Sequence, residues 1–216
     1  GALGSCILDV RDAGEPDVVA VLPGFAEPER YLEFLDSSRK TLGRLRELRG
    51  QAADSAAARL RLAPLYAAQG SKSRARSTLQ GVRGPKRLQA QALEQLARLD
   101  TVSGQVAQAR AELEQARGLI GDQDAWLLTE ASLLAAERHV SQAARLLERA
   151  LPTLAKGQEL ASGLLLLGSL QHELANDAAA LSTFSRLKAE VQAGPTAREA
   201  QERIRHIEQP EPGHTH

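Results

Sequence analysis

Two stretches of the sequence, LAPLYAAQGSKSRARSTLQGV at residues 62–82 and LARLDTVSGQVAQARAELEQA at residues 96–116, share one pattern of small and large residues. Both open on a Leu-Ala pair, place a Gly at the same distance beyond it, and continue with Ala and Leu at helical spacing. Gly70 and Gly104 occupy equivalent positions 34 residues apart. A fixed period of this length predicts a repeated pair of helices joined by a short turn.

The pattern recurs twice further along the chain. Ala131 lies 34 residues after Ala97, and Ala180 lies 37 residues after Ala143. The longer interval falls on the connection at 154–157, which carries the three extra residues. The period therefore predicts four helix hairpins, over about 55–87, 88–121, 122–157 and 158–193.

Each position of the pattern has a packing role. A small residue in the middle of the first helix lets the second helix approach closely, and a small residue early in the second helix lies at the same crossing. Because no single hairpin can bury both of its faces, the copies must stack, which predicts an all-α solenoid. The small residues are Ala63, Ala97, Ala131 and Gly168 in the first helices and Ala75, Ala109, Ala143 and Ala180 in the second.

This pattern resembles the tetratricopeptide repeat family, whose signature combines a Leu-Gly pair, a Tyr three residues later, a turn Gly, and Ala, aromatic and Ala positions in the second helix. The third copy departs from it at Glu130 and Arg138, and the Pro that usually closes a repeat is absent. The resemblance covers residues 56–190 and implies a right-handed superhelical solenoid. The matching positions are Leu167-Gly168, Tyr66, Gly70, Gly104, Phe184 and Ala116.

The segments before the repeats follow the pattern less closely. Residues 28–54 are expected to form a degenerate first hairpin, with Leu32, Leu45 and Leu48 at core positions. Residues 6–27 contain Gly, Pro and a short Val-rich run, which predicts an extended arm or linker with one short strand at most.

After the repeats the sequence predicts one further helix and a tail. Thr196 is expected to cap a helix at 196–208, whose apolar stripe makes it the C-terminal cap of the solenoid. Residues 209–216 are expected to be a disordered tail. The stripe consists of Ala200, Ile204 and Ile207.

The composition excludes several classes of protein. The chain has 216 residues, one Cys and 3% aromatic residues, which excludes a disulfide framework and disfavours a β-barrel. No apolar run approaches the roughly 18 residues of a membrane-spanning helix. No glycine-rich phosphate loop, nucleophile elbow or metal-binding helix occurs, so we expect no catalytic residue, no metal, no cofactor and no small-molecule substrate. Trp126 is expected in the core, and His139 at a surface turn.

The charges are unevenly distributed although the net charge is zero. Residues 37–88 carry thirteen basic groups against two acidic ones, whereas the flanking segments are acidic. Such a segment could meet nucleic acid, anionic headgroups or an acidic protein, and its simplest interpretation is a solvated helical face. Nucleic acid is disfavoured because aromatic stacking partners are nearly absent around the basic residues Arg59, Arg74, Arg76 and Arg83.

The resemblance implies that another protein binds in a concave groove lined by the first helix of each repeat. The basic clamp with which some relatives hold a terminal carboxylate is missing, and the groove is small and apolar with a polar centre. We therefore expect an apolar helix or extended segment as the partner. The alternative is that the solenoid closes this surface on itself or on residues 7–26. The candidate groove residues are Leu60, Glu94, Arg98, Thr101, Leu128, Ser132, Leu165, Ser169 and His172.

Cys6 bears on the cellular compartment. Leu3-Gly-Ser-Cys6 resembles the box cut by the bacterial lipoprotein peptidase, and residues 1–5 alternatively resemble a remnant of tag removal. A lipidated Cys6 would tether the chain to a membrane and suggest a periplasm-facing envelope lipoprotein. The chain would then resemble the tetratricopeptide lipoproteins that help to assemble secretins, pili or outer-membrane proteins. The alternatives are a cytoplasmic adaptor or regulatory domain of a larger protein and, third, a basic nucleic-acid-binding repeat.

Overall fold

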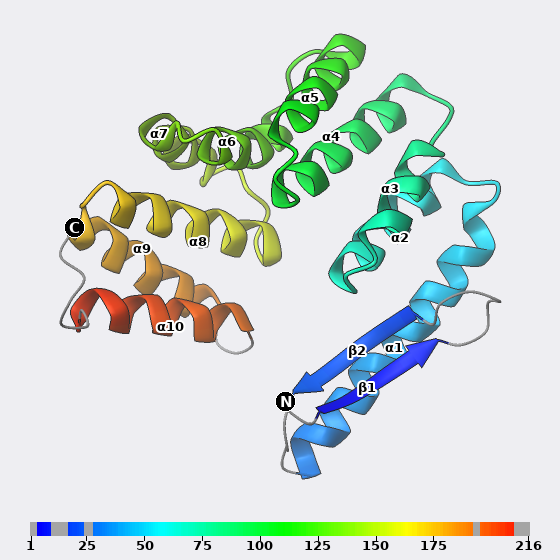
Figure 1. The fold of residues 1–216 in the computed structure, drawn as a ribbon, viewed down its shortest axis with the longest axis horizontal. Coiled ribbons are helices and arrows are strands. Elements are labelled where there is room, and N and C mark those ends of the chain that lie inside the picture. The colour runs from blue at the N-terminus through cyan, green and yellow to red at the C-terminus, as the bar shows by residue number, and fades with distance from the viewer. Residues whose placement is uncertain (1–3, 10–16, 24–27, 192–194, 210–216) are drawn as a thin grey trace. The chain divides into compact units, whose positions relative to one another are not determined.

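The computed structural model describes residues 4–9, 17–23, 28–191 and 195–209. Over these residues it contains two β-strands, ten α-helices and one short 3-10 helix (Figure 1). The elements are β1 (Gly4–Asp9), β2 (Asp17–Pro23), α1 (Pro28–Ala52), α2 (Ala56–Ala68), α3 (Lys72–Gln80), α4 (Lys86–Val102), α5 (Val106–Ile120), η1 (Asp124–Trp126), α6 (Leu127–Ala136), α7 (Val140–Ala150), α8 (Gln158–Glu173), α9 (Asp177–Glu190) and α10 (Pro195–Glu208).

The chain divides into two compact units, each with its own hydrophobic core. The N-terminal unit comprises Gly1–Leu99 and Glu114–Ile120, and the C-terminal unit comprises Asp100–Leu113 and Gly121–His216. The predominance of helix agrees with the expected fold class, which was incomplete in one respect: the N-terminal unit also contains a small antiparallel sheet.

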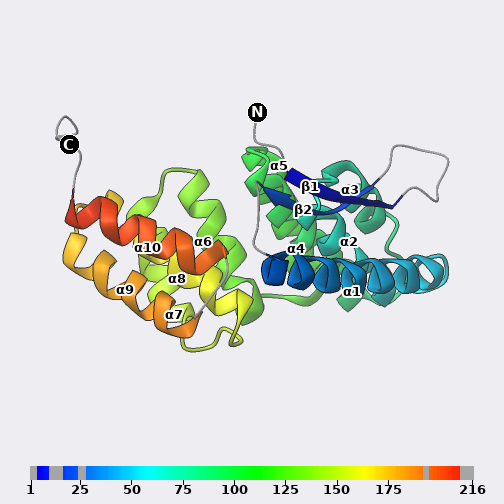
Figure 2. The ribbon, with the colours of Figure 1, turned by 90° about the horizontal axis from the view of Figure 1, so that it is seen from below.

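That sheet corrects the expectation of an extended arm at residues 6–27. β1 pairs with β2 from Gly4 opposite Pro23 to Asp9 opposite Asp17, with an irregularity between Ile7 and Leu8. β2 contacts α1, and the two strands run alongside this helix (Figure 2). The Val-rich run was recognisable as a strand, and the missed strand is the short apolar Cys6-Ile7-Leu8 segment that gives it a partner.

A single helix, α1, replaces the hairpin expected at 28–54. Its 25 residues run through Gly43 without a turn, because neither this glycine nor Gly50 is followed by a residue that stops a helix. Leu45 and Leu48 are buried, as predicted. Leu32 is 62% exposed, so its assignment to a core position was wrong.

The core of the N-terminal unit forms where α1 packs on α2 and α2 packs on α3. In the C-terminal unit α6 packs on α7, α7 on α8, α8 on α9 and α9 on α10. Trp126 is buried, as predicted. α10 begins at Pro195, which suits the first helical position, so Thr196 lies inside the helix and does not cap it. Residues 1–3 and the tail from 210 onward lie outside the described residues.

The small residues that the period predicts at helix crossings are all buried. Those in the first helices are Ala63, Ala97, Ala131 and Gly168, and those in the second helices are Ala75, Ala109, Ala143 and Ala180. The large residues that follow in the second helices, Leu79, Leu113, Leu147 and Phe184, are buried as well.

Four turns with the same backbone conformation join α2 to α3, α4 to α5, α6 to α7 and α8 to α9. The central residues have left-handed φ values: 78° at Gly70, 76° at Gly104, 65° at Arg138 and 57° at Ala175. In each turn the next N–H donates to the carbonyl five residues earlier, at 2.9, 2.8, 2.9 and 2.8 Å in chain order. This is the Schellman arrangement, which satisfies the last carbonyls of the first helix.

Candidate partner-binding surface

The predicted groove residues lie on α2, α4, α6 and α8, the helices that precede these four turns. Each turn fixes where its helix ends, so residues at the same distance before the turn occupy equivalent positions. α2 and most of α4 belong to the N-terminal unit, whereas α6 and α8 belong to the C-terminal unit.

In the N-terminal unit the candidate residues are Leu60, Glu94 and Arg98. Leu60 is 7% exposed and belongs to the hydrophobic core, so it offers little surface to a partner. Glu94 is also buried, at 8% exposed, whereas the Arg98 side chain is half exposed. The Arg98 guanidinium lies 3.9 Å from the Glu94 carboxylate, one helical turn away. The expected polar centre is thus a buried acid with an exposed base beside it.

In the C-terminal unit Leu128 is a core residue and not a surface one. It is 6% exposed, and its Cδ1 lies 3.8 Å from the position that a Cβ at Gly163 would occupy. α6 therefore packs closely on α8 through this leucine. Leu165 is half-buried against the same core, and Thr101 is half-buried near the end of α4.

Ser132 on α6 and Ser169 on α8 occupy equivalent positions and behave alike. The Ser132 hydroxyl donates to the Leu128 carbonyl at 2.8 Å, and the Ser169 hydroxyl donates to the Leu165 carbonyl at 2.9 Å. Both side chains are half-buried. Each hydroxyl uses its hydrogen within its own helix and keeps lone pairs that can accept a bond from a partner.

His172 has neighbours that sequence reasoning did not find. Its Nδ1 lies 2.6 Å from Asp177 Oδ1, and its ring meets the ring of His206 edge-on, with centroids 6.1 Å apart. His206 is 34 residues away on α10, so only the packing of α10 near α8 brings the two rings together. Within the described part of the chain, no three His, Cys, Asp or Glu side chains gather as ligands for a metal ion.

Two ion pairs join the ends of successive helices in the C-terminal unit. Arg110 on α5 makes a two-pronged pair with Glu137 at the end of α6, with Nε 3.0 Å from Oε1. Arg138 follows Glu137 directly, in the turn between α6 and α7. Its Nη2 lies 3.0 Å from Oε1 of Glu173 on α8. Glu137 and Glu173 lie at the C-terminal ends of α6 and α8, and Glu173 directly follows the candidate residue His172.

Comparison with known proteins finds no protein-family model that matches the chain and no curated protein similar to it. None of the described helices is long and apolar enough to cross a membrane. Cys6 lies in β1, opposite Val21.

Proposed function

We propose that this chain is a non-enzymatic scaffold of tetratricopeptide-like hairpins that stack into a solenoid and bind a segment of another protein. The observation that carries the proposal is the set of four matching left-handed turns, at residues 70, 104, 138 and 175. Their spacing of 34, 34 and 37 residues is the period of the buried small residues. Repeated hairpins of this kind expose the same face of each first helix, which suits an elongated partner.

The residues that remain accessible favour an apolar partner segment. On α6 and α8 the half-buried candidates are Ser132, Leu165, Ser169 and His172. Small side chains let a partner backbone approach, and one leucine offers an apolar contact. Leu128 supports this surface from beneath as a core residue of the same unit.

The test is site-specific photo-crosslinking in the native host. A benzophenone amino acid at Ser132 or Ser169 should crosslink to one and the same protein. The control is the same amino acid at Ser185, an exposed position on α9. Circular dichroism establishes that each variant is folded. Equal crosslinking from Ser185, or none from folded Ser132 and Ser169 variants, would show that this face is not the binding site.

The proposed location is the bacterial envelope, with Cys6 lipidated, and it rests on the Leu3-Gly-Ser-Cys6 box alone. The test is the intact mass of the full-length gene product recovered from bacterial membranes. A diacylglyceryl-modified Cys6 at the mature N-terminus supports a lipoprotein that assists assembly of an envelope complex. An unmodified Cys6 inside a longer chain supports the adaptor instead.

A further inference from the structure

On one face of α1 leucines predominate toward the N-terminal end and arginines toward the C-terminal end. The residues of this face recur at alternating intervals of three and four, which places them along one side of a helix. No carboxylate occupies these positions. They are Leu32, Leu35, Arg39, Leu42, Arg46 and Arg49.

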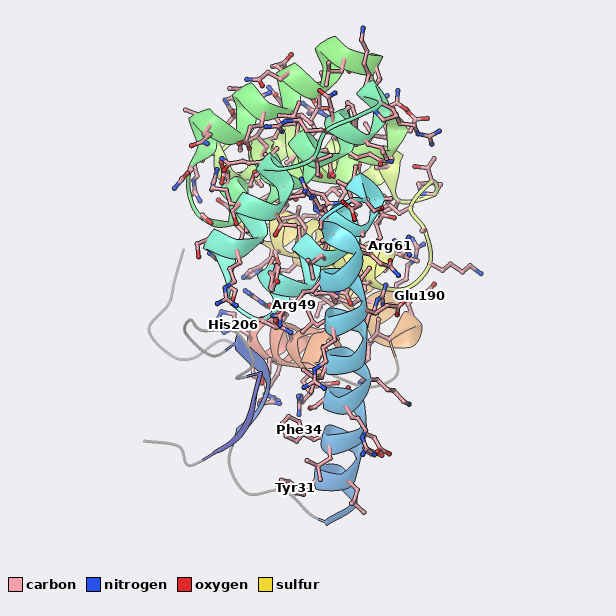
Figure 3. The ribbon with its side chains drawn as sticks, turned by 90° about the vertical axis from the view of Figure 1, so that its right-hand side faces the viewer. Tyr31, Phe34, Arg49, Arg61, Glu190 and His206 are labelled. Atoms are coloured by element: carbon pink, nitrogen blue, oxygen red, sulfur yellow. The ribbon has the colours of Figure 1, made fainter. Side chains whose placement is uncertain are left out.

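The N-terminal half of this face is exposed. Leu32 and Leu35 are 62% and 37% exposed. Tyr31, at the same end of the helix (Figure 3), is 41% exposed. Large apolar side chains exposed next to one another indicate a surface that another molecule covers. The other half of the helix is engaged, because Leu45 and Leu48 pack in the core.

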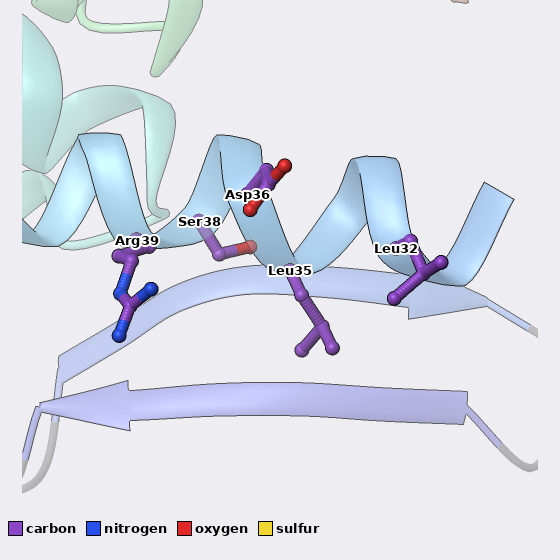
Figure 4. Close-up of a pocket in the computed structure, with 5 residues that line it drawn as sticks. All are labelled: Leu32, Leu35, Asp36, Ser38 and Arg39. Carbon is purple, nitrogen blue, oxygen red and sulfur yellow. The ribbon is translucent and has the colours of Figure 1, made fainter. Parts of the chain in front are cut away.

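A cavity of about 400 Å³ lies along this half of α1, lined by Leu32, Leu35, Asp36, Ser38 and Arg39. Leu32, Leu35 and Arg39 lie on the side of the helix that faces the strands, and Asp36 lies on the opposite side (Figure 4). On the side that faces the strands, this cavity is a slot with an apolar floor at Leu32 and Leu35 and a cationic end at Arg39, while Asp36 also lines the cavity with its carboxylate directed away from the strands (Figure 4).

We infer that this slot binds an acidic amphipathic segment of a partner protein, with apolar side chains against Leu32 and Leu35 and a carboxylate against Arg39. α1 lies outside the four proposed repeats, so this site is separate from the groove on α6 and α8. A guanidinium at the end of an apolar slot matches a carboxylate that flanks apolar side chains.

Other occupants match the face less well. A membrane surface requires basic residues that flank an apolar stripe along its whole length. Here the arginines lie within the stripe itself, and a strand lies beside the helix. Single-stranded nucleic acid requires exposed aromatic rings beside the arginines for stacking. Tyr66, which lies beside Arg49, is buried, and Tyr31 and Phe34 lie at the other end of the helix (Figure 3). A second copy would bring Arg39 and Arg46 into the helix interface, where like charges disfavour pairing.

The probes are two fluorescein-labelled synthetic peptides of about 15 residues, roughly four helical turns. Both contain Leu and Glu, one with Leu at helical spacing and one with alternating Leu. Fluorescence anisotropy with the full chain should show that one of them binds and that a scrambled peptide binds at least about tenfold more weakly. Absence of binding tighter than about 1 mM for both peptides overturns the inference.

The matched variants are Arg39→Glu and Lys40→Glu, neighbours with the same charge change on different sides of α1. Arg39→Glu should weaken binding about tenfold, and Lys40→Glu by less than about threefold. A peptide with Lys in place of Glu should bind Arg39→Glu more tightly than it binds the unmodified chain. Leu32→Asp should also weaken binding about tenfold, and it should remain folded because Leu32 is largely exposed.

Three results overturn the inference. Equal weakening by Arg39→Glu and Lys40→Glu would indicate attraction to overall charge only. Tighter binding to phosphatidylglycerol vesicles or to a single-stranded oligonucleotide than to either peptide would assign the surface to those partners. A dimer in sedimentation that Leu32→Asp abolishes would assign it to a second copy. None of these results depends on the groove of α6 and α8, so each proposal can fail without the other.

Discussion

The hairpins α2–α3 and α8–α9 have turns of the same conformation but carry different residues at the left-handed position. Gly70 adopts the left-handed conformation in the first and Ala175 adopts it in the second, with φ values of 78° and 57°. An alanine in this region costs about 1 kcal/mol because its Cβ approaches the following carbonyl. The hydrogen bonds of the turn and the packing of the two helices therefore maintain a conformation that the residue at 175 does not favour.

At the helix crossing the glycine is in the other hairpin, α8–α9, and the alanine is in α2–α3. In α2–α3 the crossing residue is Ala63, and Leu79 follows sixteen residues later. In α8–α9 the equivalent residues are Gly168 and Phe184. The larger ring occupies the room that the missing methyl group leaves. Glycine thus serves conformation in the first hairpin and close approach in the last.

The largest change in the free energy of unfolding is expected from Gly168→Ala. A Cβ at this position would lie 2.6 Å from Cε1 of Phe184, a ring that is fully buried and cannot move aside. Overpacking of this kind should lower the free energy of unfolding by about 2 kcal/mol, even after the gain in helix propensity. Urea unfolding followed by circular dichroism measures it.

Two variants provide the controls for Gly168→Ala. Adding Phe184→Leu recreates the Ala and Leu pair of the first hairpin, and should recover at least about half of the loss. Gly43→Ala, in the middle of α1 with no atom near the new Cβ, should raise the free energy of unfolding by about 1 kcal/mol. A stable Gly168→Ala protein, or a double variant less stable than the single, would contradict the exchange of volume between the two positions.

The second effect concerns how the α2–α3 hairpin is joined to α1. The Arg59 guanidinium donates to the carbonyls of Ala52 and Ala53, at 2.6 and 3.0 Å, and to that of Gly81. Arg59→Met keeps the apolar stem but leaves these carbonyls without their charged donor. It should lower the free energy of unfolding by about 2 kcal/mol, whereas the exposed Arg61→Met on the same helix should change it by less than about 0.5 kcal/mol. Equal changes in the free energy of unfolding for the two variants would show that the three hydrogen bonds of Arg59 do not stabilise the fold.

The parts of the fold that the sequence could predict are those that repeat. The period located the buried small residues, since a residue at a crossing must be small in every copy. The sheet and the continuous α1 occur once, so no period marked them. The hairpin expected at 28–54 extended the phase of the repeats upstream, yet a glycine such as Gly43 lowers helix stability without ending a helix.

The candidate site could be predicted in part, for a related reason. The family resemblance identified positions on the first helices, but burial depends on how closely the helices pack. Leu60 and Leu128 belong to the cores for this reason. The neighbourhood of His172 and His206 depends on the packing of α10, which lies beyond the repeats.

The third prediction compares the turns directly. Ala175→Gly should raise the free energy of unfolding by about 1 kcal/mol, because glycine adopts positive φ without a steric cost. Gly70→Ala should lower it by a similar amount. Thermal and urea unfolding of both variants measure the difference. Two changes of the same sign would show that factors other than the left-handed conformation decide which residue occupies the turn.

The smallest effect is expected at the turn between α6 and α7, where Arg138 holds the left-handed position. Its ion pair with Glu173 cannot explain its presence there, because the two side chains are 80% and 40% exposed. Arg138→Gln, which keeps the Cβ and removes the charge, should change the free energy of unfolding by about 0.3 kcal/mol. Arg110→Gln should cost about 1 kcal/mol, since Arg110 and Glu137 are more buried and paired through two bonds. Salt at about 1 M should abolish the first effect and reduce the second only in part. Equal costs for the two variants would mean that the exposed pair of Arg138 with Glu173 stabilises the chain as strongly as the more buried pair of Arg110 with Glu137.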